Sequence, residues 1–121
     1  MTNATLTVAV SSSFASTFTQ LMPLFTQKTG IVLRAAFAST GQLVAHIQHG
    51  APYDILLSAD QAHVILLNNM GLTIPQSQVN FAKGSLVLVV TISNHNNHGV
   101  TVLMDPRVKA IALANPSFAP Y

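Results

Sequence analysis

Three serine-bearing turns contain the residue types in this sequence that are best suited to chemistry. Each turn follows a short apolar run, and the serines lie at 11–13, at Ser39 and at Ser58. Hydroxyls are uncharged donors, and beside the free N–H groups of a helix N-terminus they suit an anion. Neutral donors favour a fully deprotonated tetrahedral oxyanion, because a protonated one needs an acceptor for its own O–H. The turns of Ser12, Ser13 and Ser39 contain no acid, so these three serines are predicted to bind such an oxyanion.

The same serines also have an ordinary structural explanation, because serine is a favoured helix N-cap. Ser39 with Gln42, and Ser58 with Gln61, have the spacing of a capping box, in which side chain and backbone satisfy each other reciprocally. Ser58 is expected to be only a cap, because Asp60 two residues later would repel an anion.

The elements that must position these turns repeat along the first part of the chain. Each repeat is an apolar β-type run, a serine, a helical pattern and a glycine, and the three predicted strands are 5–10, 31–37 and 55–57. The helices are expected to end near Thr29, His49 and Met70, and Pro23 should bend or shorten the first one. Such alternation predicts an α/β fold, a mostly parallel sheet flanked by helices. In such sheets ligands bind beyond the carboxyl ends of the strands.

The later part of the chain has a different character. Residues 85–90 (SLVLVV) are predicted to form a buried strand, and residues 91–99 a polar connector. A helical turn is expected at 102–105, followed by a last strand at 108–114.

Composition excludes several classes of function. The chain has 121 residues, of which 50% are hydrophobic and 7% charged, and its formal net charge of +2 reflects few acids rather than many bases. No nucleic-acid partner is therefore expected. The absence of cysteine excludes disulfides and thiolate chemistry. The apolar runs are too short for membrane insertion, and the first residues lack the pattern of a secretory signal peptide.

Six ordered segments give the sequence a family resemblance. They are VSSSF at 10–14, FASTGQ at 37–42, GAPYD at 50–54, SADQ at 58–61, GSLVLV at 84–89 and IALANPSFAPY at 111–121. Together they resemble the periplasmic molybdate-binding proteins of ABC importers. The resemblance implies a type II periplasmic-binding-protein fold, whose two lobes close on molybdate or tungstate.

The resemblance also implies roles for particular residues. The family's first-loop hydroxyl falls on Ser13, with Ser12 beside it, and its second-loop serine falls on Ser39. A backbone donor falls on Tyr121. The resemblance further implies a periplasmic location, an ABC importer permease as partner, no cofactor besides the molybdate or tungstate ligand, and no enzymatic activity.

Resembling proteins are roughly twice as long as this chain. Residues 1–84 are therefore expected to form the first α/β lobe, and residues 85–121 a crossover strand and an incomplete second lobe. An open cleft predicts weakened binding, because water screens the interactions that hold the ligand. The strand predicted at 108–114 would lack its own lobe, so its exposed edge is expected to pair with a second copy in a homodimer.

Other side-chain groupings support rival hypotheses. His46 with His49, and His95 with His98, lack the further ligands of a zinc site, so no metal is expected. Asp60 and His63 with a serine could form a hydrolytic triad, but the sequence has no GxSxG motif. Asp54 is expected to brace its own turn. A further alternative is a remnant, or an interaction module, that keeps the fold without binding.

Overall fold

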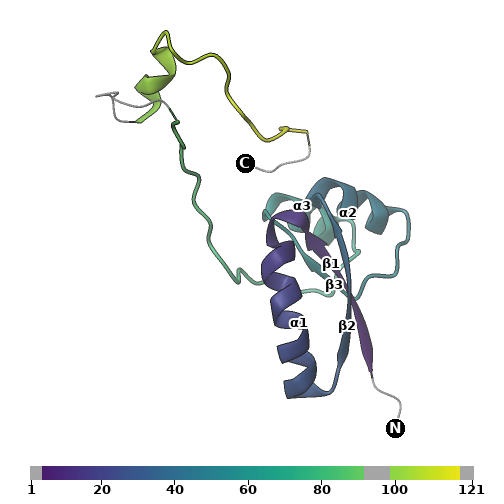
Figure 1. The fold of residues 1–121 in the computed structure, drawn as a ribbon. Helices are drawn as coiled ribbons and strands as arrows, with labels where there is room; N and C mark the ends of the chain where they lie inside the picture. The colour runs from purple at the N-terminus through teal and green to yellow at the C-terminus, as the bar shows by residue number, and fades with distance from the viewer. Residues whose placement is uncertain (1–3, 92–98, 118–121) are drawn as a thin grey trace. The chain divides into compact units, whose positions relative to one another are not determined.

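The structure, a computed structural model, describes residues 4–91 and 99–117 (Figure 1). The chain divides into two compact units, of which the second is Val79–Leu113 and the first comprises the remainder. Among the described residues, the α-helices and β-strands all lie in the first unit, before residue 79. None of the described helices is both long and apolar enough to cross a membrane.

The first unit is built on a three-stranded parallel sheet. Its strands are β1 (Thr5–Ser11), β2 (Val32–Ala38) and β3 (Ile55–Leu57), in the order β2-β1-β3. These bounds confirm the three strands predicted in this part of the chain to within a residue at each end. The central strand β1 is the most buried, since Val8, Ala9 and Val10 are at most 2% exposed. Successive side chains of a strand point to opposite faces, so β1 must be covered on both.

Two helical crossovers cover these faces. The 15-residue helix α1 (Ala15–Thr29) connects β1 to β2, and α2 (Thr40–Gln48) connects β2 back past β1 to β3. Because the two crossovers run in opposite directions and such connections are right-handed, they place α1 and α2 on opposite faces of the sheet. The helix α3 (Ala62–Asn69) packs against α2. The fold is therefore the predicted α/β arrangement of a mostly parallel sheet flanked by helices.

The face covered by α1 holds an apolar cluster. Phe18 of α1 packs with Val8 and Val10 of β1. Partly buried neighbours from α1, the turn before it and the flanking strands surround them: Phe14, Met22, Leu33, Ala35 and Leu57. The helix contains Pro23 without stopping there, and it ends where Gly30 takes a left-handed conformation with φ of 73°. Pro23 therefore does not shorten this helix, and the predicted bend stays a prediction.

The register of the sheet fixes where its strands end. Ser11 at the end of β1 pairs with Ala38 at the end of β2, and Val10 pairs with Leu57 at the end of β3. All three strands are parallel, so the turns that follow them leave from the same edge. The predicted serine turns, which follow these strands, therefore lie along this edge.

The two strands predicted in the later part of the chain are absent. Residues 85–90 and 108–114 have no strand structure, and Leu86, Val87 and Val89 are 74–79% exposed. A strand needs a neighbour for its N–H and C=O groups, and the described part of the chain provides none for these runs. The homodimer expected from the edge of the second run remains a prediction, without the strand on which it was based.

The second unit contains a 3-10 helix at Gly99–Met104, close to the predicted helical turn. The turn after it is held by an ion pair between Arg107 and Asp105, with Nη2 and Oδ2 2.8 Å apart. The hydrogen bond from the guanidinium to this carboxylate raises the pKa of Arg107.

Asp54 has a role different from the predicted one. Its Oδ2 accepts a hydrogen bond from the N–H of Thr7 at 2.8 Å, and its own N–H donates to the carbonyl oxygen of Thr7 at 2.8 Å. Asp54 therefore braces β1, 47 residues away in sequence, rather than its own turn. By accepting the N–H of Thr7, the Asp54 side chain adds one hydrogen bond to the pairing of β1 with β3.

Replacing Asp54 should loosen the start of β3. Asp54→Ala leaves the Thr7 N–H without its acceptor, and we expect the free energy of unfolding to fall by about 1 kcal/mol. Urea denaturation measures this change. Asp54→Asn keeps an acceptor oxygen, and its free energy of unfolding should fall by less than half as much. An equal fall in both variants would contradict this role.

Candidate functional site

Three turns meet at the carboxyl edge of the sheet, and we call residues 11–13, 39–42 and 58–63 together the serine edge. Ser12, Ser39 and Ser58 are each the first residue after their strand. Because β1 lies between β2 and β3, its turn is flanked by the other two. The structure thus brings the predicted loops of Ser12, Ser13 and Ser39 to one edge of the molecule.

The first turn presents its hydroxyls to solvent. Ser12 and Ser13 are exposed, and they lie in the short 3-10 helix Ser12–Phe14 that precedes α1. Ser11 is only 5% exposed, and its Oγ lies 3.2 Å from Oγ of Ser13. This contact ties the exposed hydroxyl of Ser13 to the buried end of β1, so Ser13 is oriented by its neighbour.

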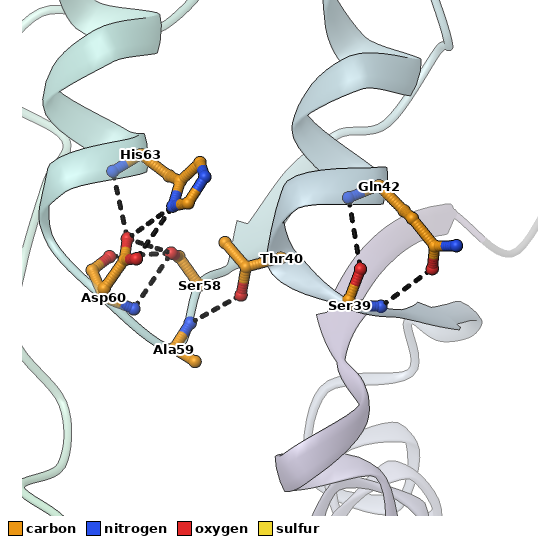
Figure 2. A network of polar contacts seen from close by, with 7 residues as sticks. All are labelled: Ser39, Thr40, Gln42, Ser58, Ala59, Asp60 and His63. Carbon is orange, nitrogen blue, oxygen red and sulfur yellow. Dashed lines mark hydrogen bonds and ion pairs between the residues drawn. The ribbon is translucent and has the colours of Figure 1, made fainter. Parts of the chain in front are cut away.

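The second turn forms the predicted capping box. Oγ of Ser39 accepts a hydrogen bond from the N–H of Gln42 at 3.3 Å, and Oε1 of Gln42 accepts one from the N–H of Ser39 at 3.3 Å (Figure 2). A hydroxyl oxygen that accepts the cap bond still has its own hydrogen to donate. Ser39 can therefore cap α2 and donate to a ligand at the same time.

The third turn differs from the predicted capping box. Ser58 does not cap α3; its Oγ donates to the carbonyl oxygen of Asp60 at 2.6 Å and accepts from the Asp60 N–H at 3.2 Å. Asp60 takes the capping role instead, since its Oδ1 accepts from the N–H of His63 at 3.0 Å. The helix starts only at Ala62, so Gln61 is at the N-cap position and not at the third helical position that a box with Ser58 would need.

A buried threonine joins the second and third turns. Thr40 is 1% exposed, and its Oγ1 accepts a hydrogen bond from the N–H of Ala59 at 3.1 Å (Figure 2). The bond connects the first turn of α2 to the loop that contains Ser58 and Asp60. The two turns therefore form one polar network.

The order of contacts around Asp60 differs from that of a hydrolytic triad. In a triad the histidine lies between the serine and the acid. Here Asp60 lies in the middle: its Oδ1 is 3.4 Å from Oγ of Ser58, and its Oδ2 is 2.8 Å from Nδ1 of His63. The serine contacts the acid, so this imidazole is not placed to take a proton from Ser58.

The histidines predicted not to bind metal have other partners or lie outside the described residues. Nδ1 of His46 is 3.3 Å from the hydroxyl of Tyr53, and Nδ1 of His49 is 2.7 Å from the carbonyl oxygen of Ala45. Within residues 4–91 and 99–117, no three histidine or acidic side chains come together as metal ligands. His95, His98 and Tyr121 lie outside these ranges, so the role expected for Tyr121 remains a prediction.

Sequence reasoning missed two residues that organise the serine edge. Ser11 and Thr40 are both buried polar side chains; Ser11 contacts Ser13 within the first turn, and Thr40 joins the second turn to the third. The signal available for Thr40 was weak. A threonine directly after an N-cap predicts nothing about a partner 19 residues away.

The bond from Ala59 to Thr40 can be tested by substitution. Thr40→Val keeps the side-chain shape but removes the acceptor, so we expect the amide hydrogen of Ala59 to exchange about tenfold faster. Hydrogen exchange followed by NMR measures this rate. Thr40→Ser retains the hydroxyl and should keep the protection; equally fast exchange in both variants would argue against the bond.

Comparisons with known proteins match this fold and sequence. The ModA molybdate-binding proteins of Rhodobacter capsulatus and Azotobacter vinelandii are each 32% identical over 114 residues, which cover 93% and 94% of this chain. The chain spans only 44% and 45% of their lengths. The solved Azotobacter vinelandii periplasmic molybdate-binding protein superposes with a TM-score of 0.57 at 34% identity, over 59% of this chain and 31% of that one.

A second solved structure supports the fold alone. It is a substrate-binding domain from Clostridium difficile, with a TM-score of 0.54 at 20% identity over 56% of this chain and 30% of that one. The family pattern described as bacterial extracellular solute-binding protein matches residues 6–121, nearly the whole sequence. With its α/β unit and this match, the chain belongs to the family of bacterial extracellular solute-binding proteins.

Proposed function

We propose that the chain binds a fully deprotonated tetrahedral oxyanion, molybdate or tungstate, as the substrate-binding component of an ABC importer. The proposed contacts are the hydroxyls of Ser12, Ser13 and Ser39 and a backbone donor at Tyr121. The observation that carries the proposal is that the serine edge presents uncharged donors from two adjacent strand ends. The likeness to ModA proteins of two bacteria supports the choice of oxyanion.

Backbone donors at the start of α2 add to these hydroxyls. The Ser39 side chain satisfies the N–H of Gln42, which is the third residue of α2. The N–H groups of Thr40 and Gly41 precede it, in the part of a helix where no carbonyl is available within the helix. Such amides carry the partial positive charge of the helix N-terminus and stabilise an anion.

The selectivity of the proposed site follows from donor chemistry. Molybdate and tungstate carry no proton at neutral pH and accept hydrogen bonds at all four oxygens. Hydrogen phosphate carries an O–H group, and a site composed of hydrogen-bond donors offers that group no acceptor. An unsatisfied polar group in a binding site is costly, so such a site discriminates against the protonated anion.

The proposal assigns this chain one side of a binding cleft. It spans less than half of the relatives that it matches, so residues of a second lobe are needed to exclude water from the ligand. Interactions with an exposed anion are screened, and the affinity of the present chain is expected to be weaker than that of a two-lobed binder. A periplasmic location and a permease partner are part of the proposal.

Two other functions compete with this one. A hydrolase using Asp60 and His63 is disfavoured because the serine contacts the acid rather than the imidazole. A non-binding remnant would keep the fold and give no response to any oxyanion. The experiment below separates these cases, because neither alternative predicts heat on mixing with molybdate.

Titration calorimetry of the 121-residue chain tests the proposed ligand. We expect saturable heat with molybdate and tungstate, and binding of phosphate at least about tenfold weaker, because its O–H lacks an acceptor. Sulfate, which is also fully deprotonated but smaller, distinguishes a size preference from a charge preference. Absence of heat with all four anions at millimolar concentration would exclude the proposal.

Ser39 can be separated from its capping role with a matched pair of variants. Ser39→Ala removes both the cap and the proposed ligand donor, and should weaken molybdate binding at least about tenfold, the loss expected for a charge-assisted hydrogen bond. Gln42→Ala breaks the capping box but leaves the Ser39 hydroxyl in place, and should change affinity about twofold at most. Circular dichroism confirms that both variants remain folded. Equal losses of affinity would assign Ser39 a structural role only.

A further inference from the structure

The serine edge contains a carboxylate, which is unexpected beside a site for an anion. Asp60 lies in the β3–α3 turn, and the bond from Ala59 to Thr40 holds this turn against the first turn of α2. The Asp60 side chain is 20% exposed, so its charge is only partly screened by water. A negative charge held here disfavours binding of a second negative charge at the start of α2.

His63 is placed to offset that charge. Its Nδ1 lies 2.8 Å from Oδ2 and 3.0 Å from Oδ1 of Asp60, so the ring is held by both carboxylate oxygens (Figure 2). The backbone N–H of His63 also donates to Oδ1, which fixes the pair at one end of α3. With Nδ1 engaged, the ring has only Nε2 available for any other partner.

The free ring nitrogen lies beside the proposed anion site. A Cβ built on Gly41 would lie 4.0 Å from Nε2 of His63, which is ordinary van der Waals contact. Gly41 is the second residue of α2, and its N–H is one of the backbone donors proposed above. The imidazole of α3 therefore borders the first turn of α2, on the side that a side chain at position 41 would occupy.

We propose that His63 is a specificity-determining residue of the oxyanion site: the ring is held by Asp60, and its protonated form cancels the carboxylate charge beside α2 and so permits a dianion to bind. The inference rests on the proposed function. It adds one charged pair to a site otherwise composed of neutral donors. The pair is neutral overall when the ring is protonated and carries one negative charge when the ring is not.

This arrangement predicts that binding of the anion and binding of a proton are linked. An anion that binds beside α2 is repelled less when His63 is protonated, so binding favours the protonated ring and takes up protons from the buffer. Affinity must then be higher where the ring carries a proton than where it is neutral, which is compared across about pH 6 to 8, where histidine in general changes its charge. Molybdate itself stays fully ionised over this range, so the change in affinity reports on the protein.

Other titratable groups near the pair are few. On α2, the helix that packs against α3, the titratable side chains are at its far end, where His46 contacts Tyr53 and His49 at the C-cap contacts the Ala45 carbonyl. The turn of His63 itself contributes Asp60. His46 therefore serves as a matched control, since it is a histidine on the neighbouring helix with a different partner.

The experiment is titration of molybdate into the 121-residue chain at about pH 7, in buffers of different ionisation enthalpy. The dependence of the observed heat on the buffer gives the number of protons taken up. We expect uptake of a fraction of a proton per anion in the unmodified chain. His63→Gln should abolish the uptake and weaken binding about fivefold. His46→Gln should change neither quantity.

A second pair of variants separates charge compensation from structure. Asp60→Asn keeps an oxygen that can cap α3, removes the charge, and should leave affinity equal or higher. The double variant Asp60→Asn with His63→Gln should recover most of the affinity lost in His63→Gln. Weakened binding in Asp60→Asn, or no recovery in the double variant, would show a merely structural role and overturn the inference.

The outcomes distinguish the two proposals. If the unmodified chain gives no heat with molybdate, the proposed function fails and the role of His63 fails with it. If molybdate binds without proton uptake, or if uptake persists in His63→Gln, the oxyanion site stands and the role of His63 is overturned.

Discussion

The parallel register of β1 between β2 and β3 is the constraint on which the rest of the structure depends. Pairing of Ser11 with Ala38, and of Val10 with Leu57, ends three strands at one edge. A shift of one residue would turn Val8 and Val10 away from Phe18 and toward the opposite face of the sheet. The burial of a short apolar strand thereby fixes where three polar turns emerge.

Polar contacts then join these turns. The hydroxyl of Thr40 holds the N–H of Ala59, and Asp60 caps α3 while it orients His63. Each bond is modest, but the Thr40 side chain is almost fully buried, where a hydroxyl without a partner is costly. The network therefore gives the edge a defined geometry. Neutral serine hydroxyls lie on one part of the serine edge. On another part, the carboxylate of Asp60 contacts His63, and this arrangement is compatible with an anionic ligand.

The failures of sequence reasoning have two physical causes. Residues 85–90 are as apolar as β1, yet they form no strand, because a strand is defined by partners that the described chain does not supply. Ser58 has the spacing of a capping box with Gln61, yet a competing local bond to Asp60 delays the start of α3. In both cases the local pattern was compatible with more than one structure.

The sequence by itself determined the three βα repeats, the cap at Ser39 and the family, because hydrophobic periodicity, capping and ordered motifs are local properties of the chain. It also predicted that Ser12, Ser13 and Ser39 follow strand ends. Only the tertiary structure decided that Ser11 and Thr40 are buried anchors, that Asp54 braces Thr7, and that His63 borders Gly41. Apart from the contact of Ser11 with Ser13, these contacts join residues from different repeats, and their geometry exists only after the sheet has set its register.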